Sequence, residues 1–255
     1  MLNIVHHGSE EQASPLLIVH GLYGSARNWG VIAKRLSDRG PVLAVDQRNH
    51  GSSPWYDTQT YQDMADDLAQ VIEAVGIGPV DLLGHSMGGK ASMVLALSRP
   101  DLVQRLVVAD IAPVGYGHSQ IQYIDAMRQV DLSGIEKRSD AEAQLAELVD
   151  DRTLQSFFTQ SLDVKEKRWR LNLDVLAHDM GHIIGFPEVA GQFDQPTLFV
   201  SGAASDYVLP EHRPKIKTLF PNASFAKIKD AGHWLHAEKP REFESVVRGW
   251  LDKAA

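Results

Sequence analysis

Short runs of apolar residues recur along the chain, and longer amphipathic stretches separate them. The runs contain few charged side chains, which is typical of strands buried on both faces of a sheet. We predict strands over residues 16–20, 42–45, 80–83, 106–109, 197–200 and 224–228. Alternation of such strands with amphipathic stretches favours a mostly parallel sheet flanked by crossover helices.

Several of the intervening stretches show a clear helical period. In residues 63–75 the apolar positions recur every three or four residues, and Gly76 follows where a helix would end. We therefore predict a core-facing helix there, with apolar positions Met64, Leu68, Val71, Ile72 and Val75. Further helices are expected over residues 91–97, which Pro100 closes, and over residues 238–250.

The pattern changes between residues 115 and 187, where strand-like runs disappear. Amphipathic segments take their place at residues 121–130, 141–149, 154–162 and 164–176. We predict that residues 115–187 form a helical cap, or lid, on an α/β core of residues 1–114 and 188–255. Large side chains of the cap could line a pocket or could pack as ordinary core. Both interpretations stay open for five of them, Tyr123, Met127, Phe157, Phe158 and Trp169.

Composition narrows the class of protein. A chain of 255 residues, 44% of them hydrophobic, suits one large domain or a core with a small insert. The net charge of −8 argues against nucleic acid and against a polybasic membrane anchor. The lack of cysteine excludes disulfides, thiolate catalysis and cysteine metal sites. Without a signal-like leader or a membrane-spanning run, we predict a soluble, cytoplasmic protein.

The strongest chemical motif is Gly84-x-Ser86-x-Gly88, between an apolar strand and a helix. Glycines on either side allow the sharp strand-to-helix turn that leaves a serine exposed at its apex. A plain turn that packs a helix on a sheet would use the same residues. Because strand and helix both stand where the motif requires them, we predict that Ser86 is a nucleophile.

A second loop suits an oxyanion hole, the set of donors that stabilises a negatively charged tetrahedral intermediate. His20-Gly21-Leu22 directly follows a core strand, and glycine lets the backbone approach a reacting group closely. We expect the backbone N–H groups of Leu22 and Met87 to point at the developing charge.

A serine hydroxyl needs a histidine to accept its proton and a carboxylate to orient that histidine. His233 follows the last strand, so it is placed to reach back over Ser86. Two carboxylates could serve as the acid, because Asp110 ends one strand and Asp206 lies in the loop after another. Either choice gives the order serine, acid, histidine.

Other polar residues have simpler interpretations. The loop after residue 45 could bind a charged ligand, but we favour Asp46 and Arg48 as ties between that loop and its neighbours. His6 and His7 read as part of a strand edge, not as a metal-binding pair. Lys90 and Arg27 could meet the phosphates of a coenzyme A thioester, although we favour solvated surface charges for both.

Five motifs together resemble the YbfF-type bacterial esterases of the α/β-hydrolase superfamily over nearly the whole chain, with the cap weakly matched. The motifs are His20-Gly21-Leu22-Tyr23-Gly24, Arg48-Asn49-His50-Gly51, Gly84-His85-Ser86-Met87-Gly88-Gly89-Lys90, Asp110-Ile111-Ala112-Pro113 and Gly232-His233-Trp234-Leu235-His236. The resemblance implies the α/β-hydrolase fold: a mostly parallel central sheet flanked by helices, with a small helical cap inserted after the sixth strand.

The resemblance also implies an activity and roles for individual residues. It implies hydrolysis of carboxylic esters, and also of acyl-CoA thioesters. Separately, we predict no cofactor and no metal. Ser86 would be the nucleophile, His233 the base, and Leu22 and Met87 the oxyanion donors. The acid would be Asp110 with Ser205 as helper, which leaves Asp206 as a turn-forming carboxylate. Perhydrolase, lactonase and carbon–carbon hydrolase activities use the same residues, and a non-catalytic small-ligand receptor could retain them.

Overall fold

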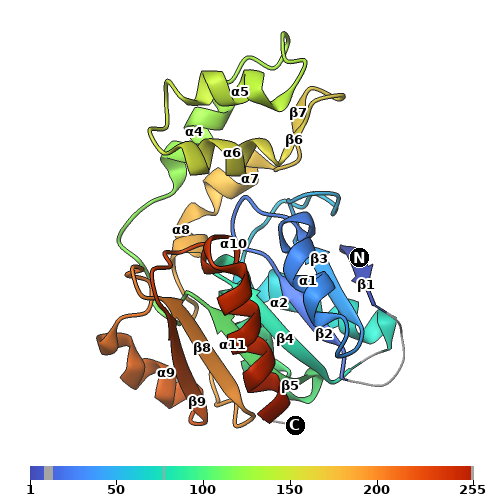
Figure 1. Ribbon diagram of the computed structural model, residues 1–255, viewed down its shortest axis with the longest axis vertical. Coiled ribbons are helices and arrows are strands. Elements are labelled where there is room, and N and C mark those ends of the chain that lie inside the picture. Colours follow the sequence, from blue (N-terminus) through green and yellow to red (C-terminus); the bar gives the residue numbers. More distant parts are fainter. Residues whose placement is uncertain (9–13, 77, 254–255) are drawn as a thin grey trace.

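The computed structural model describes residues 1–8, 14–76 and 78–253. The predicted core segments also contain residues 9–13, 77 and 254–255, which lie outside the described residues. Its centre is a seven-stranded sheet in the order β1-β3-β2-β4-β5-β8-β9 (Figure 1). Edge strand β1 runs antiparallel to β3, and the other neighbours are parallel. The strands are β1 (Asn3–His7), β2 (Leu16–Val19), β3 (Val42–Asp46), β4 (Val80–His85), β5 (Val103–Ala109), β8 (Thr197–Gly202) and β9 (Ala223–Ile228).

Helices cover both faces of this sheet because successive strand residues point to opposite sides. Leu17 packs in the apolar cluster that contains α2 (Tyr61–Val75) and α3 (Met87–Ser98). Ile18 packs in the cluster that contains α1 (Gly30–Leu36) and α11 (Pro240–Lys253). The core helices are α1 (Gly30–Leu36), α2 (Tyr61–Val75), α3 (Met87–Ser98), α9 (Arg213–Leu219), α10 (Leu235–Glu238) and α11 (Pro240–Lys253), with short 3₁₀ turns at Ala26–Trp29, Pro100–Leu102 and Pro210–His212.

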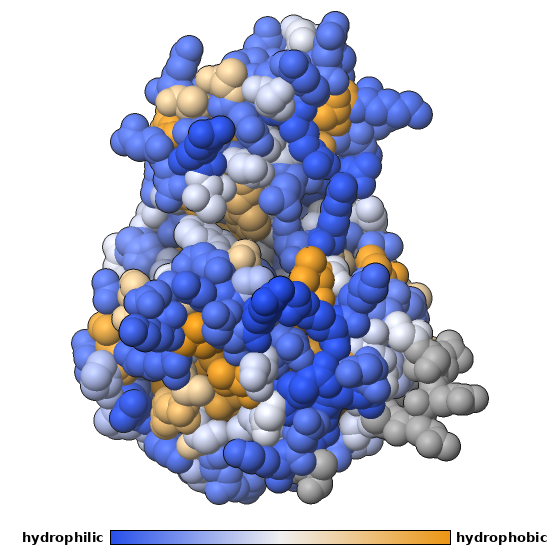
Figure 2. Space-filling view, viewed as in Figure 1, coloured by the Kyte–Doolittle hydropathy of each residue, from blue (hydrophilic) through white to orange (hydrophobic). Residues whose placement is uncertain are grey.

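The segment between β5 and β8 rises above the carboxyl end of the sheet (Figure 1). It contains α4 (Ile121–Gln129), α5 (Arg138–Leu145), α6 (Arg152–Thr159), a hairpin of β6 (Leu162–Asp163) and β7 (Arg168–Trp169), α7 (Leu173–His178) and α8 (Met180–Ile184). Figure 2 shows that the upper part of the visible face carries mostly hydrophilic residues, with hydrophobic residues in small separate groups.

The predicted fold class and all six predicted strands are confirmed. The predicted helix over residues 63–75 begins slightly earlier, because the Thr60 side chain accepts a hydrogen bond from the Asp63 N–H and caps its start. It ends as expected, with Gly76 at a φ of 67°. His6 and His7 lie in the edge strand β1, as the sequence indicated.

Two predictions about the inserted segment are wrong. It follows the fifth of the described strands, not the sixth, because the core contributes five strands before it. The amphipathic stretch at residues 164–176 is not one helix, because residues 162–169 turn back on themselves as the β6–β7 hairpin before α7 begins. Among the residues described, no helix is long and apolar enough to cross a membrane.

Candidate active site

Ser86 lies at the turn between β4 and α3, where the backbone is strained. Its φ of 52° is in a region that L-residues other than glycine rarely adopt, and such strain is typical of functional sites. A Cβ on Gly84 would lie 2.4 Å from the Gly88 carbonyl oxygen, and a Cβ on Gly88 would lie 2.4 Å from the His20 carbonyl oxygen. Both glycines are therefore required for the turn to close against its neighbours.

His233 connects Ser86 to Asp110. Its Nε2 lies 3.0 Å from the Ser86 Oγ, and its Nδ1 lies 2.8 Å from the Asp110 Oδ2. These contacts join the carboxyl ends of β4, β5 and β9, because parallel strands deliver their following loops to the same edge of the sheet. The arrangement lets the imidazole accept the serine proton while the carboxylate fixes the ring.

The Asp110 carboxylate is fully buried and bound on both oxygens. The Gly202 N–H donates to its Oδ1 at 3.0 Å, and the Ser205 hydroxyl donates to its Oδ2, which also contacts His233. Asp206 is exposed, and its side chain forms no hydrogen bond within the described part of the chain. The structure thus brings Asp110 to His233 and Ser205 to Asp110, and it leaves the alternative acid, Asp206, outside these contacts.

The loop that carries Leu22 is held by two buried histidines. The Gln47 N–H donates to the His20 Nε2 at 2.9 Å, so the His20 Nδ1–H donates to the Gly21 carbonyl. The Tyr23 N–H likewise donates to the His50 Nε2 at 3.2 Å, which leaves the Nδ1–H for the Arg48 carbonyl. Burial lowers the pKa of His20. Burial, together with the neighbouring His20 ring, lowers the pKa of His50 to about 3. Both rings are therefore neutral at neutral pH.

The same loop approaches Ser86 closely. A Cβ on Gly21 would lie 3.1 Å from the Ser86 Cβ, which is tighter than an ordinary contact, so glycine helps the backbone pass this near the nucleophile. Leu22 and Met87 line the same cavity as Ser86. The two predicted oxyanion donors are thus both residues of the cavity wall that contains Ser86. Sequence reasoning did not find the supporting roles of His20 and His50, although His20 stands beside Gly21 at a strand end.

The loop that carries His233 is also fixed from several sides. The His85 Nε2–H donates to the His233 carbonyl at 2.8 Å, and burial holds the pKa of His85 well below its ordinary value. The Tyr207 ring stacks on the His233 imidazole, with 4.0 Å between ring centroids. Glu238 accepts hydrogen bonds from the backbone N–H groups of Gly232 and Trp234. The imidazole therefore has little freedom to turn away from Ser86.

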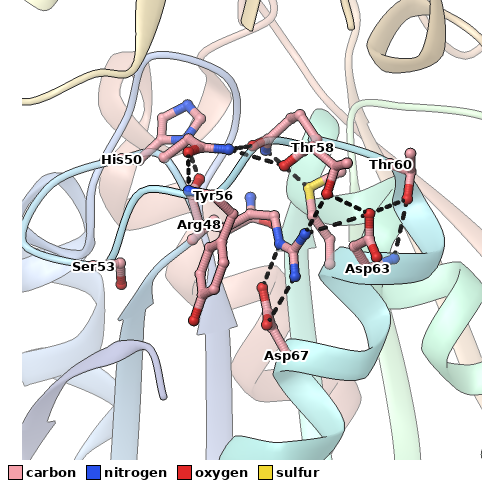
Figure 3. A network of polar contacts seen from close by, with 12 residues as sticks. Arg48, His50, Ser53, Tyr56, Thr58, Thr60, Asp63 and Asp67 are labelled. Carbon is pink, nitrogen blue, oxygen red and sulfur yellow. Dashed lines mark hydrogen bonds and ion pairs between the residues drawn. The ribbon is translucent and has the colours of Figure 1, made fainter. Parts of the chain in front are cut away.

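Asp46 and Arg48 tie their loop to its neighbours, as predicted. The Arg48 guanidinium donates to both oxygens of Asp67 on α2, at 2.6 and 3.1 Å, and to the Thr58 hydroxyl (Figure 3). The Asp46 carboxylate accepts from the backbone N–H groups of Ala26 and Ser52. Both side chains therefore bind neighbouring segments and hold this loop in place.

A cavity of about 270 Å³ opens above Ser86 and His233. Of the predicted cap side chains, Tyr123, Phe157 and Phe158 line it. Trp169 and Met127 do not, because the Trp169 indole N–H donates to the Met127 carbonyl at 2.9 Å and the two pack inside the cap.

The favoured interpretation of Lys90 as a surface charge is wrong. Its side chain is 1% exposed and lines the cavity, whereas Arg27 is exposed and lies outside that cavity. The motif offered no signal for this burial, because lysine one turn after a nucleophile elbow can equally point to solvent.

The sequence matches the model of the alpha/beta hydrolase fold family over residues 14–240. It is 41% identical to the sn-1-specific diacylglycerol lipase ABHD11 of Danio rerio, over 94% of this chain and 78% of that protein. It is 36% identical to Esterase YbfF of Escherichia coli K12, over 96% of this chain and 95% of that protein. A solved structure described as a marine microorganism esterase superposes with a TM-score of 0.93 at 37% identity, over 98% of both chains.

Proposed function

This chain belongs to the α/β-hydrolase fold family and is a carboxylesterase-type hydrolase, and on that premise we propose that it cleaves carboxylic esters through an acyl-enzyme on Ser86. The contact of 3.0 Å between the His233 Nε2 and the Ser86 Oγ carries this proposal. It is the hydrogen bond through which a general base would activate the serine.

In the first half of the reaction, His233 accepts the Ser86 proton as the Oγ attacks the ester carbonyl. The negative charge that forms on the carbonyl oxygen is stabilised by the N–H groups of Leu22 and Met87. Asp110 stabilises the imidazolium through the contact of 2.8 Å, and Ser205 and Gly202 hold Asp110 in place. His233 then gives the proton to the departing alcohol, and the acyl group remains on Ser86.

In the second half, water takes the place of the alcohol. His233 accepts a proton from the water, the resulting hydroxide attacks the acyl carbonyl, and the same oxyanion donors stabilise the second tetrahedral intermediate. Collapse releases the carboxylic acid and returns the proton to the Ser86 Oγ.

Residues 115–187 act as the cap of this site, on a core of residues 1–114 and 188–255. Tyr123, Phe157 and Phe158 from the cap line the cavity opposite Ser86, which supports a role in admitting the acyl or alcohol group. Of the two activities, we favour hydrolysis of esters over hydrolysis of coenzyme A thioesters. A thioester would benefit from cations at the pocket mouth, and Lys90 is buried while Arg27 lines a different cavity.

The proposal is tested by hydrolysis of p-nitrophenyl esters from acetate to palmitate with the wild type and Ser86→Ala. We expect turnover in the wild type and loss of about 10⁴-fold or more in kcat in the variant, with circular dichroism to show that it folds. Equal rates in the two proteins would contradict the proposal. Tight ligand binding without turnover would instead favour the receptor alternative, and peracid formation from acetate would indicate a perhydrolase.

A further inference from the structure

Lys90 is a buried lysine without a carboxylate partner, in the wall of the cavity that contains Ser86. No carboxylate in residues 1–8, 14–76 and 78–253 forms an ion pair with it. Buried charges in proteins are ordinarily paired, because removing an ammonium from water is costly. Burial lowers the pKa of Lys90 to about 7, which is the expected response of an unpaired ammonium. The mechanism at Ser86 makes no use of this group.

The surroundings of the ammonium satisfy it only in part. The Lys90 Nζ donates to the carbonyl oxygens of Ile184, at 3.0 Å, and of Gly185. It also lies 4.7 Å from the centre of the Tyr116 ring and 5.7 Å from that of Tyr61. An ammonium has three N–H donors, so one remains after the two carbonyls, and neither carbonyls nor aromatic faces carry a neutralising charge.

The position of Lys90 on α3 relates its side chain to the acyl group of an ester. Lys90 lies one helical turn after Ser86, since its backbone N–H donates to the Ser86 carbonyl at 3.0 Å. Side chains on a helix lean toward its N-terminus, which here is the Ser86 end. The acyl group is bonded to Ser86 in the acyl-enzyme, whereas the alcohol departs toward His233, which protonates it. The Lys90 side chain therefore leans toward the end of α3 at which the acyl group is attached.

We propose that Lys90 binds a carboxylate at the far end of the acyl group, so that half-esters of short dicarboxylic acids are preferred substrates. A cavity of about 270 Å³ suits an acyl chain of this size. This assignment rests on ester hydrolysis at Ser86 and adds the class of acyl group that the site selects.

The test compares two esters that differ only at the end of the acyl chain, ethyl hydrogen succinate and ethyl butyrate. We expect the wild type to prefer the succinate ester in kcat/KM, and Lys90→Met to lower the ratio of the two kcat/KM values by about 10- to 100-fold, as loss of a charged hydrogen bond would. Lys90→Gln, which keeps an N–H donor without the charge, should also lose most of the preference. Lys34→Met, which removes an exposed lysine of α1, is the matched control and should leave the ratio unchanged.

A second measurement needs no variant. Because the ammonium loses its proton as the pH rises, the wild-type ratio should fall between about pH 6 and about pH 9, with a midpoint near the pKa of Lys90. The succinate carboxylate stays ionised over this range, and the chemistry at Ser86 and His233 is common to both esters. The tyrosines Tyr61 and Tyr116 face Lys90, and burial raises the pKa of each, so they stay protonated over this range.

The outcomes separate the two proposals. A ratio that stays the same in Lys90→Met, or that is flat with pH, would overturn the role of Lys90 while leaving ester hydrolysis intact. A wild type that prefers ethyl butyrate would do the same. Failure of the wild type to hydrolyse either ester, or equal rates in Ser86→Ala, would overturn both. If Lys90→Met does not fold, Lys90→Gln and the wild-type pH profile still test whether Lys90 selects the succinate ester.

Discussion

The ends of the core strands and the cap segment build the two sides of one cavity by different means. Positive φ angles occur at Tyr23, Asn49, Ser86, Asp110 and Asp230, and each lies in a loop that follows a core strand. Within the described cap residues, the only non-glycine residue with a positive φ is Lys167. Strained backbone persists only where its surroundings determine it fully. The sheet thus holds the reactive groups in demanding positions, whereas ordinary helix packing supplies the opposite wall.

We therefore expect the strand ends to determine the rate of the reaction and the cap to determine which esters are accepted. Changes at the strand ends should act on the rate for every ester, because all substrates share the same carbonyl chemistry. Changes in the cap should act on the choice of ester and leave the chemistry in place.

Among variants that retain Ser86, the largest effect is expected from the carboxylate at the end of β5. Asp110→Asn should lower kcat by about 10³- to 10⁴-fold, because an amide no longer stabilises the imidazolium and favours the wrong tautomer of His233. Asp206→Asn should change kcat by less than about threefold, since the Asp206 side chain is exposed and away from the imidazole. Steady-state kinetics on one p-nitrophenyl ester measure both. A large loss in Asp206→Asn with a small one in Asp110→Asn would reverse the assignment.

A strand-end loop can also be weakened without touching the reacting atoms. Arg48→Met leaves Asp67 as a buried carboxylate without its partner, which should cost about 3–5 kcal/mol in the free energy of unfolding. Urea denaturation measures this loss. Arg99→Met provides the control, because the ion pairs of Arg99 are on the surface and their loss should barely move the midpoint. Equal midpoints in the two variants would mean that the loop after β3 is not held by this pair.

The smallest effect is expected in the cap. Phe157 lies on α6, lines the cavity and contacts Trp234, with 6.1 Å between ring centroids. Phe157→Ala should move the preferred acyl length upward while changing the best kcat by only about two- to fivefold, because space is gained and no reacting group is lost. Leu148→Ala, an exposed cap position, should leave the length profile as in the wild type. A general fall in kcat with an unchanged length profile would show that the cap supports the chemistry itself.

The sequence predicted the core better than the cap, for a physical reason. Strands such as β2 and β4 are buried on both faces, so their apolar runs are continuous and bounded by glycine or polar residues. The loops after those strands carry the motif residues, which is why the sequence alone predicts Ser86 and His233, whereas the choice of Asp110 over Asp206 comes from the family resemblance. The hairpin of β6 and β7 is only two residues per strand, too short to produce a periodic signal.

Contacts between distant segments were the other part that the sequence did not reveal. His20 and His50 support the Leu22 loop through hydrogen bonds that cross 27 residues of the chain. The Lys90 Nζ donates to the carbonyl oxygen of Ile184, which lies 94 residues further along the chain. The burial of Lys90 therefore depends on how the inserted segment returns to the core. A single sequence carries local periodicity and motif spacing, and neither reports such tertiary partners.

The central claim is that an acyl group is carried on Ser86. The most direct measurement mixes the wild type with p-nitrophenyl acetate, quenches in acid within the first turnovers, and determines the intact mass and the modified peptide by mass spectrometry. The account predicts a burst of nitrophenol and a single acetyl group on the peptide that contains Ser86, with no adduct in Ser86→Ala. Turnover without any adduct under these conditions, or an acetyl group on another residue that persists in Ser86→Ala, would contradict it.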